Sequence, residues 1–365
     1  MTLILNDDDV MRIVSMPSCI DALEEAFRDL RSGTAVNAPR RDSFMASGRD
    51  DAYYSFKTIE GGLESLGVMA QRINSDLITH PVIAGGRRRV KVPAAPGDRY
   101  VGLIFLYSSE TLELLAIMTD GQLQRMRVAG TSAVGAKYLS REDSRVVGLL
   151  GAGWQAGAAA EALASVRALS TIKVFSPNVE HRESFAEEMS GELGIDVLPV
   201  DSAREAVSDS DMVACATNSA TEVVKGAWVE EGMHLTSIRA HEFDEEAWRR
   251  SDAIVLSGPP GSQGYSNFGT SDFEHHHRAS EREGERTLTE DERFERYRGK
   301  AHMLSDLLAD KVPRRTTSSQ VTMMNKNWGL GIEFAAAAKV AYDRAKEDGA
   351  GVEIATEYFS QLSHP

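Results

Sequence analysis

Three small residues in the middle of the chain have the spacing of a dinucleotide-binding turn. Gly151, Gly153 and Ala156 form G-x-G-x-x-A directly after the apolar run 146–150. The first glycine allows a tight turn, the second lets backbone N–H groups approach a pyrophosphate, and the alanine lets a following helix lie close to the strand. The helix N-terminus adds the positive end of a dipole. We therefore predict a dinucleotide site here; the alternative is a Gly-rich turn in an ordinary α/β domain.

The end of the next predicted strand, residues 171–175, bears on which dinucleotide would bind. A site that prefers NAD usually has Asp or Glu about 20 residues after the turn, where it holds the ribose 2′-OH. Ser176 and Asn178 stand there instead, and Arg182 lies just beyond. Arg182 could accept a 2′-phosphate, or it could be an ordinary residue at a helix start. The cofactor that we expect is NADP or NAD, with a slight preference for NADP.

Polar residues follow the predicted fourth strand, residues 212–216. They are Thr217, Asn218 and Ser219. Ligands bind at the carboxyl ends of strands in such sheets, so these side chains could line the nicotinamide end of the site. A turn rich in Asn and Ser is the alternative interpretation, because both residues are common in turns.

Three arginines in the N-terminal part have a suitable type for carboxylate binding. They are Arg41, Arg72 and Arg127. A guanidinium group holds a carboxylate through two parallel hydrogen bonds. Opposite a dinucleotide site, such groups would suit an amino or keto acid. The alternative for each is a surface ion pair.

The pattern of the remaining chain predicts the elements that position these residues. Strands and helices alternate from the Gly-rich turn onward, as in a doubly wound sheet. The strands expected in this part are 146–150, 171–175, 196–200, 212–216, 233–238 and 253–257. The earlier part is β-rich, and the elements expected there are strands at 53–57, 67–73, 100–107 and 112–118 and helices at 7–33 and 122–139.

The C-terminal part breaks the alternation. Residues 258–300 are predicted to be a loop followed by an exposed helical or mobile insertion, and 301–309 a short helix. A long helix is predicted over 321–345, which would cross back to the first domain. The fold class that we expect is α/β, with a Rossmann-type doubly wound sheet inserted into a discontinuous α+β domain. The expected boundaries are 1–128 plus 320–365 for the discontinuous domain and 129–319 for the Rossmann domain.

Composition excludes several kinds of partner. The formal net charge is −15, which argues against nucleic acid and anionic membranes. The two cysteines lack zinc-site spacing, and the adjacent histidines 275–277 cannot all face one metal, so we expect no metal site. We see no signal peptide and no apolar run long enough to span a membrane, and we expect a cytoplasmic protein.

The order of these parts resembles the ornithine cyclodeaminase/μ-crystallin family over nearly the whole chain. The most specific stretches are LLAIMTDGQLQRMRVAGTSAVGAKYL and VVGLLGAGWQAG, supported by NAPRRDSF, LGVMAQRINSD, DMVACATNS and RRTTSSQVTMMNKNWGLGIEFAAAA. The resemblance implies a homodimer with a Rossmann domain for NAD(P). The first domain and the C-terminal helix would bind a small amino or imino acid and form the subunit interface. Members begin with hydride exchange at the Cα–N bond.

The resemblance also implies residue roles. Arg41 and Arg127 match arginines that clamp the substrate carboxylate. The residues that match cofactor-binding positions are Gly151, Gly153, Trp154 and Gln155 in the phosphate turn and Asn218 and Ser219 after the fourth strand.

Two departures from the family fall in the catalytic chemistry. The active-site lysine of the family corresponds to Arg72, and arginine effectively cannot lose its proton. The cyclodeaminases also have an Asp after the fifth strand, in a stretch that is shortened here around His241 and leaves no clear match. His241 or Lys57 could replace the lost proton carrier, although either could equally be structural.

Three functions are compatible with these observations. The first is an NAD(P)-dependent oxidoreductase of the amino-acid dehydrogenase or imine/ketimine reductase type, acting at the Cα–N bond. The second is an ammonia lyase of the cyclodeaminase type that recycles bound NAD⁺. The third is a non-catalytic protein that binds NADP(H). Because both departures affect cyclisation chemistry and leave the nucleotide turn intact, we favour the oxidoreductase.

Overall fold

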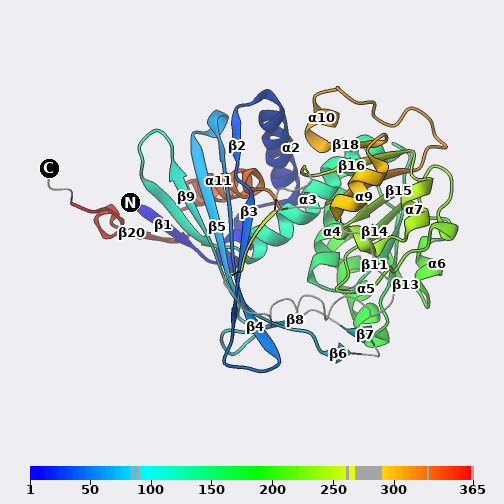
Figure 1. The fold of residues 1–365 in the computed structure, drawn as a ribbon, viewed down its shortest axis with the longest axis horizontal. Helices are drawn as coiled ribbons and strands as arrows, with labels where there is room; N and C mark the ends of the chain where they lie inside the picture. Colours follow the sequence, from blue (N-terminus) through cyan, green and yellow to red (C-terminus); the bar gives the residue numbers. More distant parts are fainter. Residues whose placement is uncertain are drawn as a thin grey trace.

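The computed structural model has two lobes, each built on one large sheet (Figure 1). It describes the 365-residue chain except residues 84–85, 88–89, 220, 260–262, 268–289, 327–328 and 363–365. Helix α3 (Gly121–Leu139) runs between the two lobes, and the C-terminal segment projects from the side opposite the second lobe. The prediction that histidines 275–277 do not share a metal concerns residues outside the described ranges.

The first lobe contains a mixed ten-stranded sheet with the main order β17-β3-β4-β5-β9-β10-β1-β20, in which β2 also pairs with β4 and β8 with β5. Its strands are β1 (Thr2–Leu5), β2 (Ala35–Asn37), β3 (Arg40–Ala46), β4 (Ala52–Leu63), β5 (Val68–Thr79), β8 (Val90–Val92), β9 (Val101–Ser108), β10 (Leu114–Thr119), β17 (Gln263–Asn267) and β20 (Val352–Ile354). A small hairpin is formed by β6 (Val82–Ile83) and β7 (Gly86–Arg87). The four strands predicted in this part are confirmed, and β4 and β5 are longer than predicted.

The first lobe is completed by helices α1 (Asp7–Ile13), α2 (Met16–Ser32) and α11 (Gly331–Asp348) and the 3-10 turns η1 (Glu64–Leu66) and η4 (Thr356–Phe359). The single helix expected over 7–33 is wrong, because Ser15 is an N-cap that starts a second helix there. Helix α11 lies close against β4. A Cβ atom on Gly61 would lie 2.3 Å from the carbonyl carbon of Gly331, so glycine is required at this contact.

The second lobe is a parallel eight-stranded sheet with the order β13-β12-β11-β14-β15-β19-β16-β18. Its strands are β11 (Val146–Leu150), β12 (Thr171–Phe175), β13 (Asp196–Pro199), β14 (Met212–Cys215), β15 (His234–Ser237), β16 (Ala253–Leu256), β18 (Ala301–Met303) and β19 (Thr322–Asn325). Its helices are α4 (Trp154–Val166), α5 (Val179–Leu193), α6 (Ala203–Val207), α7 (Glu245–Arg250), α9 (Glu290–Tyr297) and α10 (Leu304–Leu308), with 3-10 turns η2 (Gly226–Trp228) and η3 (Ala240–Glu242).

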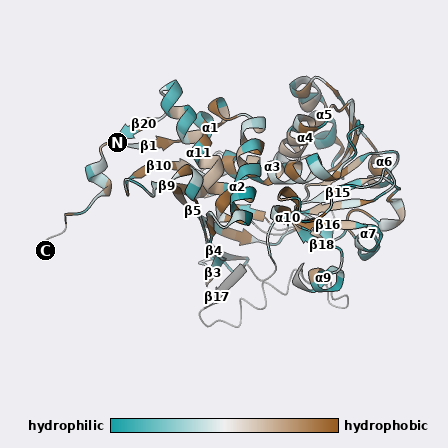
Figure 2. Ribbon diagram, turned by 90° about the horizontal axis from the view of Figure 1, so that it is seen from above, coloured by the Kyte–Doolittle hydropathy of each residue, from teal (hydrophilic) through white to brown (hydrophobic). Residues whose placement is uncertain are grey.

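Helices cover both faces of this second sheet. One apolar core joins the sheet to α4 and α5, and a separate core joins it to α6 and α7. Figure 2 shows apolar residues along the strands and hydrophilic residues on the outer helices α7 and α9. The expected Rossmann-type doubly wound sheet is therefore confirmed, including all six predicted strands.

Two strands of the second sheet were missed. The predicted helix over 321–345 is wrong at its start, because residues 322–325 form β19 between β15 and β16. All four residues of β19 are buried, and a short apolar run of this kind has no periodicity that separates strand from helix. The predicted helix over 301–309 likewise begins with strand β18. The chain therefore leaves the second sheet after Asn325, not at the predicted boundary of 320.

The segment 258–300 also contains structure that the sequence did not predict. Strand β17 pairs in parallel with β3 and so extends the first sheet, although a loop was expected there. Helix α9 falls in the half of the segment that was expected to be helical. Within the described part of the chain, no helix has both the length and the apolar character needed to cross a bilayer.

His234 is a fully buried histidine at the start of β15. Its Nδ1 lies 2.9 Å from Thr322 Oγ1, and that hydroxyl donates to the carbonyl of Leu139 at 2.8 Å. The hydroxyl therefore accepts, and His234 Nδ1 carries the hydrogen. The other ring nitrogen, Nε2, has no hydrogen-bond partner among the residues that the structure describes. Burial lowers the pKa of His234 to about 3 from 6.5.

The low pKa of His234 makes stability pH-dependent. Below the unfolded pKa the unfolded chain binds a proton at this ring and the folded chain does not, so stability is lost as the pH falls. Between pH 6 and pH 4 the free energy of unfolding should fall more steeply in the wild type than in His234→Asn, by about 1.4 kcal/mol per pH unit. Urea unfolding at several pH values measures both slopes; parallel curves would contradict the assignment.

Candidate functional site

The Gly-rich turn lies where the order of the second sheet reverses, with β11 between β12 and β14. Ligands bind outside the carboxyl ends of strands at such a point. Gly151 has a φ of +113°, and a Cβ there would lie 2.4 Å from the carbonyl oxygen of Ala216. Gly153 is the N-cap of α4, and no atom lies within 4 Å of the place of its missing Cβ. The open space and the unpaired N–H groups of a helix start fit a pyrophosphate.

The ribose edge of the predicted site lies at the carboxyl end of β12. Asn178 caps α5 by accepting a hydrogen bond from His181 N at 3.0 Å. Arg182 donates to the Ser176 carbonyl at 3.4 Å and is paired with the carboxylate of Asp201. Arg182 therefore lies at the predicted ribose edge, where its guanidinium is paired with the carboxylate of Asp201.

The segment after β14 is held by a buried acid that sequence reasoning missed. Thr217 donates from its backbone N and from its Oγ1 to Oε1 of Glu242, both at 2.8 Å. Ser219 is buried and its carbonyl lies 3.0 Å from Nε2 of His241. Asn218 between them is exposed. The structure thus brings the predicted cofactor segment and His241 together.

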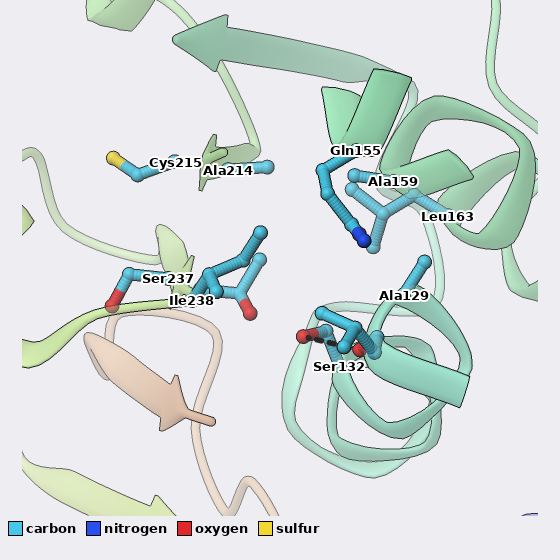
Figure 3. Close-up of a pocket in the computed structure, with 11 residues that line it drawn as sticks. Ala129, Ser132, Gln155, Ala159, Leu163, Ala214, Cys215, Ser237 and Ile238 are labelled. Carbon is cyan, nitrogen blue, oxygen red and sulfur yellow. Dashed lines mark hydrogen bonds between the residues drawn. The ribbon is translucent and has the colours of Figure 1, made fainter. Parts of the chain in front are cut away.

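A pocket next to the Gly-rich turn lies between α3, α4 and the carboxyl ends of β14 and β15 (Figure 3). It is lined by Val128, Ala129, Ser132, Gln155, Ala159, Leu163, Ala214, Cys215, Thr236, Ser237 and Ile238. Gln155 points into it. Within the described part of the chain, the Oε1 atom of this residue and the buried Oγ1 of Thr236 have no hydrogen-bond partner. Trp154, by contrast, is 52% exposed at the helix start. Of the two neighbours, Gln155 is the one that reaches the inside of the site.

The inner face of the first sheet carries a polar strip. Arg72 and Asp76 on β5 are buried, and Lys57 on β4 lies opposite Asn74. Arg72 donates through Nε and Nη2 to Oδ2 of Asp120, at 2.8 and 2.5 Å. Lys57 Nζ lies 3.1 Å from Oδ2 of Asp76. Arg72 and Lys57, two of the predicted catalytic residues, therefore lie on one face as diagonal neighbours on adjacent strands, each beside a carboxylate.

Lys57 is not the sole cation beside Asp76. Lys91 Nζ lies 2.9 Å from Oδ1 of the same carboxylate. Burial would raise the pKa of Asp76, but the two lysines outweigh it and the pKa is lowered. The carboxylate therefore stays charged and keeps Lys57 in place.

Arg127 lies in a second buried cluster around the carboxylate of Glu333. Arg127 Nη1 donates to Glu333 Oε2 at 2.6 Å, and Thr131 Oγ1 donates to Oε1 at 2.7 Å. Lys326 pairs with the same carboxylate. The ring of Phe334 separates this cluster from Arg72, with the guanidinium carbons of Arg127 and Arg72 at 4.4 and 5.6 Å from its centre.

The charges in the Glu333 cluster shift one another's protonation. Burial lowers the pKa of Arg127 and lowers that of Lys326 to about 8. Burial alone would raise the pKa of Glu333, but Lys326 and Arg127 outweigh it and lower the pKa. Lys326 was not predicted, because its place beside Arg127 depends on β19, the strand that the sequence pattern did not reveal.

Arg41 is not brought together with the other two arginines. It pairs with Thr58 in the ladder between β3 and β4, whereas Asp42 lies opposite Lys57. Because side chains alternate along a strand, Arg41 points to the opposite face, where it is exposed. Arg40 takes its place on the inner side, held by Asp42 through two hydrogen bonds of 2.7 Å. The sequence alone does not show whether Arg40 or Arg41 faces inward, because this depends on the register of β3 against β4.

Comparison with known proteins gives the same fold and one family. The family described as "Ornithine cyclodeaminase/mu-crystallin family" matches residues 91–349. The chain is 27% identical to alanine dehydrogenase of Archaeoglobus fulgidus over 366 residues, which covers 97% of this chain and 98% of that protein. It is 26% identical to the ketimine reductase mu-crystallin of Macropus fuliginosus over 69% of this chain and 74% of that protein.

A solved structure matches the full length. It is Δ1-pyrroline-2-carboxylate reductase of Thermococcus litoralis in complex with NADH and L-proline, with a TM-score of 0.74 and 28% identity. The match covers 97% of this chain and all (100%) of that chain. Both lobes and their connection are therefore shared with that protein.

Replacing Glu333 tests how much the buried cluster contributes to stability. Glu333→Gln leaves two buried cations without their shared carboxylate, and we expect the free energy of unfolding to fall by about 3–5 kcal/mol. Glu347→Gln at the exposed end of α11 is the matched control, which should change it by no more than about 0.5 kcal/mol. Chemical denaturation of both variants gives the values, and equal small losses would show that the cluster contributes little.

Proposed function

The chain belongs to the ornithine cyclodeaminase/mu-crystallin family, and from this we propose that it is an NAD(P)-dependent oxidoreductase acting at the Cα–N bond of a small amino or imino acid. The observations that carry the proposal are the open Gly-rich turn at the reversal point of the second sheet and two buried arginines, Arg72 on β5 of the first sheet and Arg127 on the connecting helix α3. Relatives named alanine dehydrogenase, ketimine reductase and pyrroline-2-carboxylate reductase support it.

The cofactor would lie along the carboxyl edge of the second sheet. Gly151, Gly153 and the first turn of α4 would hold the pyrophosphate, and Asn218 and Ser219 would flank the nicotinamide. When bound, the dinucleotide would supply or accept the hydride. The protein would contribute binding, orientation and proton transfer.

The substrate carboxylate would bind to Arg72, with Arg127 and Arg40 nearby. Arg72 uses Nε and Nη2 for Asp120, and within the described residues its Nη1 has no hydrogen-bond partner, so it could bind a ligand. Asp120 holds the guanidinium in a fixed orientation, which reduces the entropy lost on binding. Arg127 and Arg40 add positive charge beside it.

Proton transfer needs a group other than Arg72. Burial lowers the pKa of His241, so its ring is neutral near pH 7. Its Nε2 faces a carbonyl, so Nδ1 is the nitrogen that can accept a proton from the substrate amine and return it. Lys57 is held beside Asp76 and is the second candidate. The homodimer and the cytoplasmic location expected from the sequence remain part of this proposal.

Cofactor oxidation tests the proposed reaction. The purified protein, given NADPH or NADH with Δ1-pyrroline-2-carboxylate or with keto acids plus ammonia, should consume the reduced cofactor. Gly153→Asp places a negative charge where the pyrophosphate would bind and should reduce kcat/KM roughly 100-fold. Gly191→Asp is the control, because that glycine also has open space around it but lies on α5. Cofactor binding without turnover of any substrate would contradict the proposal, and ammonia release without net cofactor oxidation would point to the lyase.

Arg182 decides the preference for NADP in this proposal. Arg182→Ala should raise the KM for NADPH roughly tenfold and leave that for NADH nearly unchanged, because only NADPH carries the 2′-phosphate. Asp201→Asn releases the guanidinium from its carboxylate partner and should have the opposite effect on NADPH. Equal effects on both cofactors would assign Arg182 a structural role and favour NAD.

A further inference from the structure

Glu242 is a fully buried acid beside Thr217–Ser219, the segment that would flank the nicotinamide and that we call the nicotinamide edge. The proposed reaction does not use this acid. Its Oε1 accepts both hydrogen bonds of Thr217, and its Oε2 accepts one from the backbone N of Arg239 at 3.0 Å. Its own carbonyl accepts from Val223 N and Val224 N at 2.9 and 3.1 Å. One residue therefore joins the loop after β14 to the loop after β15.

The hydrogen bonds continue from Thr217 to the rest of the cofactor segment. Thr217 Oγ1 accepts from Ser219 N at 3.2 Å, so the hydroxyl that donates to Glu242 also fixes the next turn. Ser219 Oγ donates to the carbonyl of Thr221 at 2.9 Å. The positions of Thr217 and Ser219 thus depend on a carboxylate from another loop.

The same network sets the tautomer of His241. The ring nitrogen Nε2 lies 3.0 Å from the carbonyl oxygen of Ser219. A carbonyl can only accept, so Nε2 carries the hydrogen and Nδ1 keeps its lone pair. The position of that carbonyl is fixed by Thr217 and hence by Glu242, which follows His241 directly in the chain.

A buried carboxylate is costly unless its oxygens are well hydrogen-bonded. Burial raises the pKa of Glu242, although the donors from Thr217 and Arg239 oppose the shift. Glu242 forms no ion pair among the described residues. Its three donors are two backbone N–H groups and one hydroxyl, all on the two loops that it joins, which suits a role in fixing their geometry.

We propose that Glu242 is the positioning residue of the nicotinamide edge, which holds Thr217–Ser219 in place for the cofactor and presents His241 with Nδ1 available for proton transfer. This inference rests on the proposed function, because it assigns a partner to the proposed proton carrier. Besides burial, the charged groups that act on His241 are Arg239, Arg293 and Glu222.

Glu242→Gln is the direct test. It keeps the size of the side chain but puts an amide in place of one accepting oxygen, so either the Thr217 or the Arg239 bond is lost. We expect the Kd for NADH or NADPH to rise about tenfold. The acid limb of the kcat/KM profile for amino-acid oxidation should move to higher pH, because a less fixed ring becomes better hydrated. Glu246→Gln on α7, a half-exposed acid of the same region, should match the wild type.

A second variant covers the case in which Glu242→Gln does not fold. Thr217→Val keeps the shape of the side chain and removes only the hydroxyl, which breaks the side-chain bond to Glu242 and the bond from Ser219. It should raise the cofactor Kd and move the acid limb in the same direction by a smaller amount. Wild-type affinity and an unmoved limb in both folded variants would overturn the proposal.

The tautomer of His241 can be measured without cofactor or turnover. Nitrogen-15 NMR, with the signal assigned through His241→Asn, should find hydrogen on Nε2 in the wild type and in Glu246→Gln, and a mixture in Glu242→Gln or Thr217→Val. An unchanged tautomer in both variants would overturn the positioning role. A wild type that binds no dinucleotide would instead overturn the proposed function, with the NMR result standing by itself.

Discussion

A single carboxylate, that of Glu333, joins the parts of this molecule that must stay in register. It lies on α11 of the first lobe, and it binds Arg127 of the connecting helix α3 and Lys326 at the end of β19 in the second lobe. All three are buried, and the backbone N of Leu330 adds a further hydrogen bond at 3.0 Å. Since none of these charges can be solvated by water, separating the lobes here leaves charges unpaired in the interior. The two ion pairs therefore hold α11, α3 and the end of β19 together.

Two buried acids, Glu333 and Glu242, have different surroundings and different structural roles. Glu333 is paired with two cations, which lower its pKa; Glu242 accepts hydrogen bonds from neutral donors, and burial raises its pKa despite these donors and the charge of Arg239. The first fixes one lobe against the other, and the second joins neighbouring loops within one lobe. The replacement of the family lysine by Arg72 fits this arrangement. A permanently charged guanidinium held by Asp120 can orient a carboxylate, but it is a poor proton carrier.

Much of the fold was predictable because it depends on local patterns. The turn at Gly151 and Gly153 follows from backbone freedom and helix geometry, and every strand predicted in the second lobe is present. The strand β19 was not predictable, because four consecutive buried residues leave no periodicity to interpret. The break before Ser15 was missed for another reason, since the N-cap role of this serine was not recognised within the region predicted as one helix.

The sequence by itself determined the family resemblance, the Gly-rich turn and the presence of arginine at residue 72, since these depend on residue type and short spacing. The tertiary structure decided which charges meet. It placed Arg41 outside and Arg40 inside, because strand register alone sets the face of a side chain. It also brought Lys326 to Glu333 and Glu242 to Thr217, contacts that depend on loops from different strands meeting at one sheet edge. No pattern along the chain predicts such contacts, because they arise from the order of strands in the sheet.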